Sequence, residues 1–231
     1  MSLLEKITII DIILFLIALT IVIAFTFNIK VSIDNHSINK FINQIGEYNT
    51  AIISFRSKYG FLPGDALNTK IFDLSLNKSD GNGNGIIEDH NQMNDIKNKK
   101  IQFNGEVYNF FIHLYNSGFL KNKNKEIFPY NDIMDTGILV FSKKNINYYH
   151  FAIYKAKMNK NIETINNLTP FDAEKIDKKF DDGFPFSGKI QAFGGNYINY
   201  KNDIGKNCAN DKEYLLFYRQ KNCQLIMELG K

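Results

Sequence analysis

Apolar residues fill the first part of the chain and then settle into a regular spacing. From Ile12 to Phe27 only two threonines interrupt the apolar run. Farther along, apolar residues recur at steps of three and four, which places them on one helical face: Ile38, Phe41, Ile45, Tyr48, Ile52, Phe55 and Tyr59. Gly60 and then Pro63-Gly64 are helix stop signals. The pattern predicts one helix from Ile7 to Tyr59, either continuous or broken near Asn35.

The first half of this predicted helix has the length of a membrane span. About 20 consecutive apolar residues cross a bilayer as a helix, and residues 7–29 carry one charged side chain, Asp11. A cleaved secretory signal has a shorter apolar core followed by small residues, and Phe25–Ile29 does not supply them. The segment therefore predicts a transmembrane helix that is retained as an anchor.

The rest of the chain alternates one short helical pattern with several strand patterns. Glu106–Tyr115 predicts a second helix that ends near Gly118, with Val107, Phe110, Phe111 and Leu114 pointing inward. Segments rich in β-branched and aromatic residues predict strands at 137–142, 147–154, 214–218 and 223–229. An antiparallel sheet packed on the second half of the long helix is an α+β fold.

Composition and cysteine usage narrow the class of protein. Aromatic residues make up 14% of the chain and the net charge is +4, which is typical of a globular protein. The lysines are scattered among asparagines, without the dense basic and aromatic cluster of a nucleic-acid surface. Behind a membrane segment, Cys208 and Cys223 are expected to form a disulfide. Two buried free thiols are the alternative.

Several motifs, in the right order along the chain, resemble the type IV pilin and type II secretion pseudopilin superfamily. Residues 7–11, ITIID, resemble the start of the family's apolar segment, with residues 1–6 as a leader. Residues 55–65, FRSKYGFLPGD, resemble the stretch that ends the long helix in one group of these proteins. Further matches are the Gly/Asn-rich loop at 80–85, the aromatic helix at 110–120 and the acidic stretch at 176–183.

The resemblance implies roles for four residues near the N-terminus. In the family, prepilin peptidase cuts after a glycine and methylates the new N-terminus; here Lys6 stands in its place and Ile7 follows. The family's membrane acid pairs with the terminal amine of a neighbouring subunit, which implies an assembly role for Asp11. Interfacial snorkelling of Asp11 beside Lys6 is the alternative. A second register places Glu5 at the assembly position.

The sequence DGNGNGIIEDHN contains part of a calcium-loop spacing. Asp80, Asn82 and Asn84 fall at the first, third and fifth places of an EF-type loop, and Glu88 is a further candidate ligand. The twelfth place lacks the usual glutamate, because Asn91 stands there. The alternative is a turn built from residues that tolerate positive φ.

A second acidic group and the four histidines complete the chemically relevant residues. The acidic group, Asp177, Asp181 and Asp182, is expected to be a structural turn, with a metal site as the alternative. Motifs of serine hydrolases, zinc proteases and phosphate-binding loops are missing from the sequence. The four histidines are dispersed along the chain, so we expect a protein that is not an enzyme.

These observations together predict a pilin-like structural subunit of a type IV pilus or a type II secretion pseudopilus. It would lie in the bacterial inner membrane with its N-terminus cytoplasmic and its head periplasmic or extracellular. Inner-membrane lipid, homologous subunits and prepilin peptidase are the expected partners. The expected parts are a leader (1–6), a transmembrane helix (7–29), an amphipathic helix (30–60) and the head (61–231). The alternatives are a membrane-anchored periplasmic domain of the same fold that does not polymerise, with or without calcium, and an anchored hydrolase or calcium-dependent binder.

Overall fold

The computed structural model describes residues 9–70, 80–88, 104–121, 129–131, 136–156, 162–193 and 207–230. The chain divides into two compact units, Met1–Ile42 and Asn43–Lys231. The division lies inside the first helix, α1, which extends over Ile9–Tyr59. Of the four parts expected from the sequence, the leader, the amphipathic helix and the head stay predictions, and the two units are described separately.

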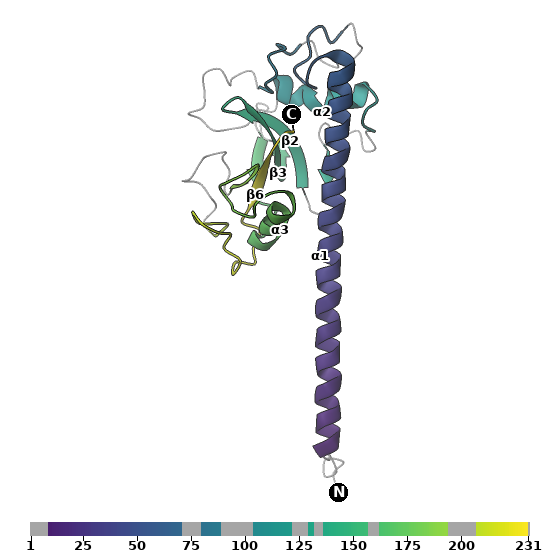
Figure 1. Cartoon of the computed structure of the whole chain (residues 1–231), viewed down its shortest axis with the longest axis vertical. Coiled ribbons are helices and arrows are strands. Elements are labelled where there is room, and N and C mark those ends of the chain that lie inside the picture. The colour runs from purple at the N-terminus through teal and green to yellow at the C-terminus, as the bar shows by residue number, and fades with distance from the viewer. Residues whose placement is uncertain are drawn as a thin grey trace. The chain divides into compact units, whose positions relative to one another are not determined.

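Within the first unit, the described residues belong to α1, drawn in purple in Figure 1. Crossing a bilayer takes about 20 apolar residues in one helix; among the residues described, no helix combines the length and the apolar character that this needs. The expected single-pass inner-membrane location, with its transmembrane helix, is therefore wrong. The cytoplasmic N-terminus and the periplasmic or extracellular head were deduced from that location, so these expectations are not supported either.

The second unit contains the last turns of α1, and the apolar stripe predicted there is buried. Ile45, Tyr48, Ile52 and Phe55 are each at most 5% exposed. The helix ends at Tyr59, where the stop signal was predicted. Gly60 follows with φ at 79°, a conformation that favours glycine, and its N–H donates to the Arg56 carbonyl oxygen at 2.9 Å.

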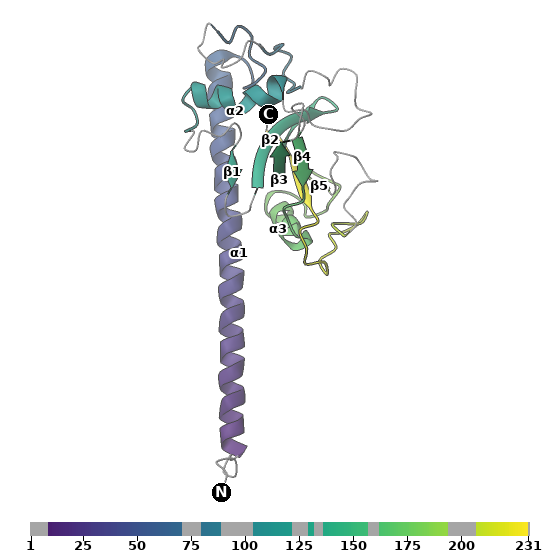
Figure 2. The ribbon, with the colours of Figure 1, turned by 180° about the vertical axis from the view of Figure 1, so that it is seen from behind.

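The second helix, α2 (Gly105–Asn116), packs against these last turns of α1 (Figure 2). Its four predicted inward residues are at most 1% exposed. Aromatic rings join the two helices: Tyr48 meets Phe111 edge to face with 5.6 Å between ring centroids. The ring of His113 stacks on Phe55 at 6.0 Å. This helix pair forms one half of the core.

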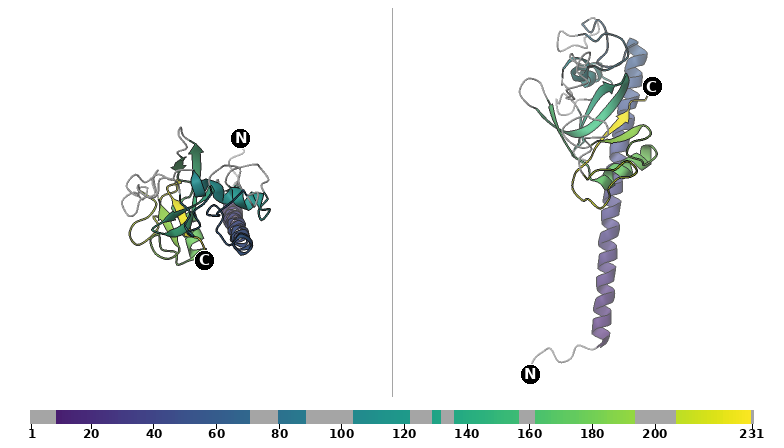
Figure 3. Two further views of the ribbon diagram at one scale, coloured as in Figure 1. Left: turned by 90° about the horizontal axis from the view of Figure 1, so that it is seen from above. Right: turned by 90° about the vertical axis from the view of Figure 1, so that its left-hand side faces the viewer.

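An antiparallel sheet supplies the other half of the core (Figure 3). Its strands are β1 (Tyr130–Asn131), β2 (Thr136–Lys143), β3 (Ile146–Ala156), β4 (Ile162–Ile165), β5 (Ile190–Phe193) and β6 (Gln224–Glu228). The order is β1-β2-β3-β6-β5, and β4 pairs with the end of β3. The last of these strands along the chain, β6, therefore lies inside the sheet, between β3 and β5. The fold is α+β, as predicted.

The strands β1, β4 and β5 were not predicted from the sequence, and two further parts of the second unit also differ from the prediction. Tyr214–Tyr218 is not a strand, because the N–H of Leu216 donates to the carbonyl oxygen of Tyr214 and closes a tight turn. A third helix, α3 (Pro170–Phe180), was not predicted. Thr169 caps it: its hydroxyl oxygen accepts the Asp172 N–H, and the Asp172 carboxylate accepts the Thr169 N–H. This capping box stabilises the start of α3, which lies at one end of the sheet (Figure 1).

Candidate functional site

The α1 segment from Ile10 to Ala24 presents apolar side chains to solvent around its whole circumference. Eleven large apolar residues are between 43% and 67% exposed: Ile10, Ile12, Ile13, Leu14, Phe15, Leu16, Ile17, Leu19, Ile21, Val22 and Ile23. A helix that is apolar on all sides is normally covered by other protein or by lipid. We call residues 10–24 the apolar segment, and it is the first candidate site.

Asp11 is the acid of the apolar segment. It lies in the first turn of α1 and is exposed. A carboxylate in the first turn is favoured by the positive end of the helix dipole. The other three N-terminal candidates, Glu5, Lys6 and Ile7, lie outside the described residues. The roles assigned to all four stay predictions.

The second candidate site is the Gly/Asn-rich loop, residues 80–88, where calcium ligands were predicted. Asp80 turns toward Thr69, and its Oδ1 accepts both the Thr69 N–H, at 2.9 Å, and the Thr69 hydroxyl. Asn82 Nδ2 donates to Glu88 Oε2 at 3.1 Å. The Oδ1 atoms of Asn82 and Asn84 each accept the N–H two residues farther on, which is an Asx turn. Backbone contacts thus engage three of the four candidate ligands, and calcium binding stays a prediction.

A buried acid that was not singled out from the sequence organises this loop. Asp65 is 1% exposed, and its carboxylate accepts three consecutive loop N–H groups. Gly83 donates to Oδ1 at 2.7 Å, Asn84 donates to Oδ1 at 3.2 Å, and Gly85 donates to Oδ2 at 2.7 Å. Successive backbone N–H groups form a concave binding site for an anion. Here the anion that they bind is the chain's own Asp65.

Glu106, in the first turn of α2, holds the same loop through its two ends. Its Oε1 accepts the Asn82 N–H and its Oε2 accepts the Glu88 N–H, both at 2.9 Å. Burial raises the pKa of Glu106 to about 7; the two N–H donors oppose the rise, and the neighbouring carboxylates of Asp65 and Glu88 add to it. Burial also raises the pKa of Asp65, against its N–H donors. The carboxylates of Asp65 and Glu106 thus hold the loop through its backbone N–H groups.

The backbone lies so close to these acids that only glycine fits at two positions. A Cβ on Gly81 would lie 2.4 Å from the Asp65 Cα, and a Cβ on Gly64 would lie 2.5 Å from the Glu106 carbonyl oxygen. The φ of Gly64 is also positive, at 85°. No local pattern in the sequence links Asp65 or Glu106 to the loop, because the contacts join segments far apart in the chain.

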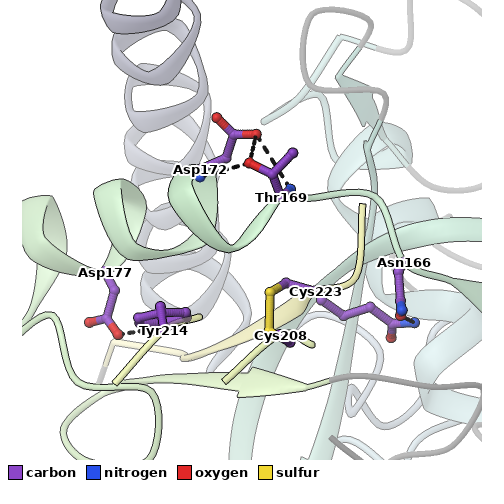
Figure 4. The surroundings of a disulfide bond; sticks show 8 residues. Asn166, Thr169, Asp172, Asp177, Cys208, Tyr214 and Cys223 are labelled. Carbon is purple, nitrogen blue, oxygen red and sulfur yellow. Dashed lines mark hydrogen bonds between the residues drawn. A yellow bond between two sulfur atoms is a disulfide. The ribbon is translucent and has the colours of Figure 1, made fainter. Parts of the chain in front are cut away.

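The second acidic group lies where α3 ends. One carboxylate oxygen from each of Asp177, Asp181 and Asp182 lies within 4.8 Å of the others. Asp177 is buried: Gly183 N–H donates to its Oδ1 at 3.1 Å, and the Tyr214 hydroxyl donates to its Oδ2 at 2.7 Å (Figure 4). Burial raises the pKa of Asp177 to about 6.

The other two acids of this group bind the turn that follows α3. Asp181 Oδ2 accepts the N–H groups of Lys189 and Ile190. Asp182 accepts the Ser187 hydroxyl at 2.6 Å, which lowers the pKa of Asp182. Each carboxylate therefore has a structural use in this turn, and a metal there stays the alternative.

The predicted disulfide is present. Cys208 and Cys223 are joined and fully buried (Figure 4). Cys223 lies just before β6 and forms an isolated antiparallel bridge with Leu168: its N–H donates to the Leu168 carbonyl oxygen at 2.9 Å. The closed loop, residues 208–223, contains Tyr214, so the disulfide and the hydroxyl bond to Asp177 hold the same loop.

Two histidines, His113 and His150, are core residues. Both are 0% exposed, and burial lowers the pKa of each to about 4. His113 Nδ1 accepts the Gly64 N–H at 2.9 Å. His150 Nε2 lies 2.9 Å from the side-chain oxygen of Gln224, and its Nδ1 lies 3.0 Å from the Tyr154 hydroxyl. These contacts fit structural histidines that stay neutral at pH 7.

No protein-family model, no curated protein and no solved structure matches the chain.

Proposed function

We propose that this protein is a structural subunit that assembles with homologous copies through the apolar segment of α1, as the subunits of a type IV pilus or a type II secretion pseudopilus do. The observation that carries the proposal is the apolar segment itself, with eleven large apolar side chains exposed around one helix. Apolar surface of this extent marks an interaction site. A second copy of the same helix supplies a matching apolar surface.

The motifs that resemble the pilin superfamily support the same proposal. Head-to-tail contacts between identical subunits generate open helical filaments when the rotation does not close. Asp11 would fix the register of neighbouring helices by meeting a positive charge of the next copy, because a buried pair of opposite charges best serves to specify register. Prepilin peptidase would expose the amine of Ile7 for this contact.

The proposed role is structural and not enzymatic. The acids described above accept hydrogen bonds from backbone amides and hydroxyls, and the two core histidines have lowered pKa values. The head, in this account, is a stable module that the assembled helices carry. Its loops, at residues 80–88 and 181–190, are then surfaces displayed along the filament.

The experiment compares the assembly of the full chain with that of two lysine variants. Ile17→Lys places a charge in the apolar segment, where Ile17 is 51% exposed, and Ile53→Lys is the matched control, at a position 64% exposed on the same helix. We expect regular filaments by negative-stain electron microscopy for the native chain and for I53K. I17K is expected to sediment as a folded monomer.

Two results would overturn the proposal. Filaments of I17K that match those of the native chain would show that the apolar segment is not the contact. A native chain that stays monomeric at every concentration tested would favour the domain that does not polymerise. Circular dichroism of each variant verifies that the head is folded.

A further inference from the structure

The sequence contains three Asn–Gly pairs, Asn82–Gly83, Asn84–Gly85 and Asn104–Gly105. Asparagine followed by glycine is prone to deamidation, because glycine has no Cβ to hinder the approach of its backbone nitrogen. That nitrogen attacks the asparagine Cγ, the Cγ–Nδ2 bond breaks, and ammonia leaves with the proton of the glycine N–H. Water then opens the cyclic imide and leaves aspartate or isoaspartate.

Two of the three attacking nitrogens are bound by one buried carboxylate. The Gly83 N–H donates to Asp65 Oδ1 and the Gly85 N–H donates to Asp65 Oδ2, each at 2.7 Å. Gly83 N also lies 3.1 Å from the Asp65 carbonyl oxygen. Hydrogen bonds to a charged acceptor are about twice as strong as neutral ones. Both nitrogens are therefore held away from the reaction by the same residue.

The carbons that would be attacked belong to side chains that water reaches. Asn82 and Asn84 are exposed, and their Oδ1 atoms accept the N–H groups of Asn84 and Ile86. Water, the co-reactant that opens the imide, has access to the loop. Asp65 therefore restrains only the attacking nitrogens of Gly83 and Gly85, and the asparagine side chains and water remain able to react.

We propose that Asn82 and Asn84 form a latent deamidation site and that Asp65 sets its rate by holding the amides of Gly83 and Gly85. The proposal is independent of filament assembly. The contacts of the loop also predict that deamidation at Asn82 accelerates deamidation at Asn84. Asn82 Nδ2 donates to Glu88 Oε2 at 3.1 Å, so an aspartate at position 82 would place two carboxylates in contact. Their repulsion loosens the loop, and deamidation at Asn84 follows faster.

The test follows deamidation at all three pairs by peptide mass spectrometry in water labelled with heavy oxygen. The native chain is incubated folded, and again unfolded in urea, at one pH and temperature. We expect reaction at Asn82 and Asn84 to be about tenfold slower in the folded chain, the factor that corresponds to one hydrogen bond to a charged group. Equal rates at these two sites in both states would overturn the proposal.

Two variants assign the protection to Asp65. Asp65→Asn removes the charge that holds both amides, and Glu88→Gln removes a charge from the same loop while leaving both amides on Asp65. Asn104–Gly105, at the start of α2, is the internal reference. Relative to it, D65N is expected to react faster at Asn82 and Asn84, and E88Q is expected to have the native initial rate.

An unchanged ratio in D65N, or an equal rise in E88Q, would contradict the assignment. If D65N unfolds, the reference site accelerates as well. The comparison of folded and unfolded native chain then decides the proposal without the variant.

Discussion

The Tyr149 hydroxyl donates a 2.8 Å hydrogen bond to Asn49 Oδ1. This bond joins β3 to the last turns of α1 across 100 residues of sequence. Tyr149 is 0% exposed, and burial raises its pKa far above the usual range, so the hydroxyl remains a donor at all ordinary pH values. The pair ties the helix layer of the head to its sheet.

Removing this hydroxyl is expected to destabilise the head. Tyr149→Phe leaves Asn49 Oδ1 without its donor, and we expect the free energy of unfolding to fall by about 1 kcal/mol. Urea unfolding followed by circular dichroism measures the change. Tyr218→Phe is the control, because Tyr218 lies in the turn after Leu216 and is only partly buried. An equal loss of unfolding free energy in both variants would show that the Tyr149–Asn49 hydrogen bond does not stabilise the head more than an ordinary tyrosine hydroxyl does.

The disulfide is expected to contribute a larger share of the stability. It closes a loop of 15 residues, for which the chain-entropy account gives about 3 kcal/mol. We expect the double variant C208A/C223A to unfold at a lower urea concentration by a corresponding amount. Adding a reductant should shift the native chain in the same direction and leave the variant unchanged. A native chain insensitive to reductant at its unfolding midpoint would contradict this.

The sequence predicted the elements that have strong periodicity. The end of α1 at Tyr59 followed from a regular apolar stripe and a glycine, and α2 followed from its inward aromatic residues. The strands β2 and β3 were predicted because both are long and rich in aromatic and β-branched residues. In each case the local pattern and the tertiary contacts favour the same structure.

Other features depend on contacts that local pattern does not reveal. Tyr214–Tyr218 has the composition of a strand, but the disulfide and the bond to Asp177 fix it as a turn, with Phe217 70% exposed. Asp65 and Glu106 meet the loop across 18 to 24 residues of sequence. The start of α3 is different, because Thr169 and Asp172 are a capping signal that is readable in the sequence and was overlooked there.

Acid is expected to destabilise the protein through His113. The pKa of this histidine is about 4 in the folded chain, because it is buried, and rises to about 6.5 on unfolding. The unfolded chain therefore binds more protons between these values, and stability falls as the pH decreases from about 6.5 to 4. His113→Asn keeps an acceptor for the Gly64 N–H and lacks the titration. Its stability should depend less on pH in this window.

Measurement of the His113 pKa by NMR provides the direct check. A folded-state value near 6.5 would contradict the burial argument. If the stability of H113N depended on pH as steeply as that of the native chain, groups other than His113 would take up the protons on unfolding.

Glu106 is expected to make the head less stable as the pH rises, which is opposite to the effect of His113. Its pKa is about 7 when folded and about 4.3 when unfolded. The folded chain therefore binds more protons in this window, and this group's contribution to stability falls as the pH rises from about 4.3 to 7. Glu106→Gln removes the titration, so the native chain should lose stability relative to E106Q over that range. A constant difference between the two would contradict the raised pKa.

Contact between the apolar segments of two copies is the central claim, and cross-linking tests it most directly. Ile13→Cys introduces one free thiol at a side chain that is 50% exposed, because both native cysteines are in the disulfide. Copies carrying two different tags are mixed under assembling conditions and treated with a flexible bismaleimide, which can join the introduced thiols of staggered head-to-tail neighbours. We predict a covalent dimer that carries both tags, and none from Ile53→Cys. An I13C chain that stays monomeric, with its introduced thiol reacting freely with maleimide, would contradict the account.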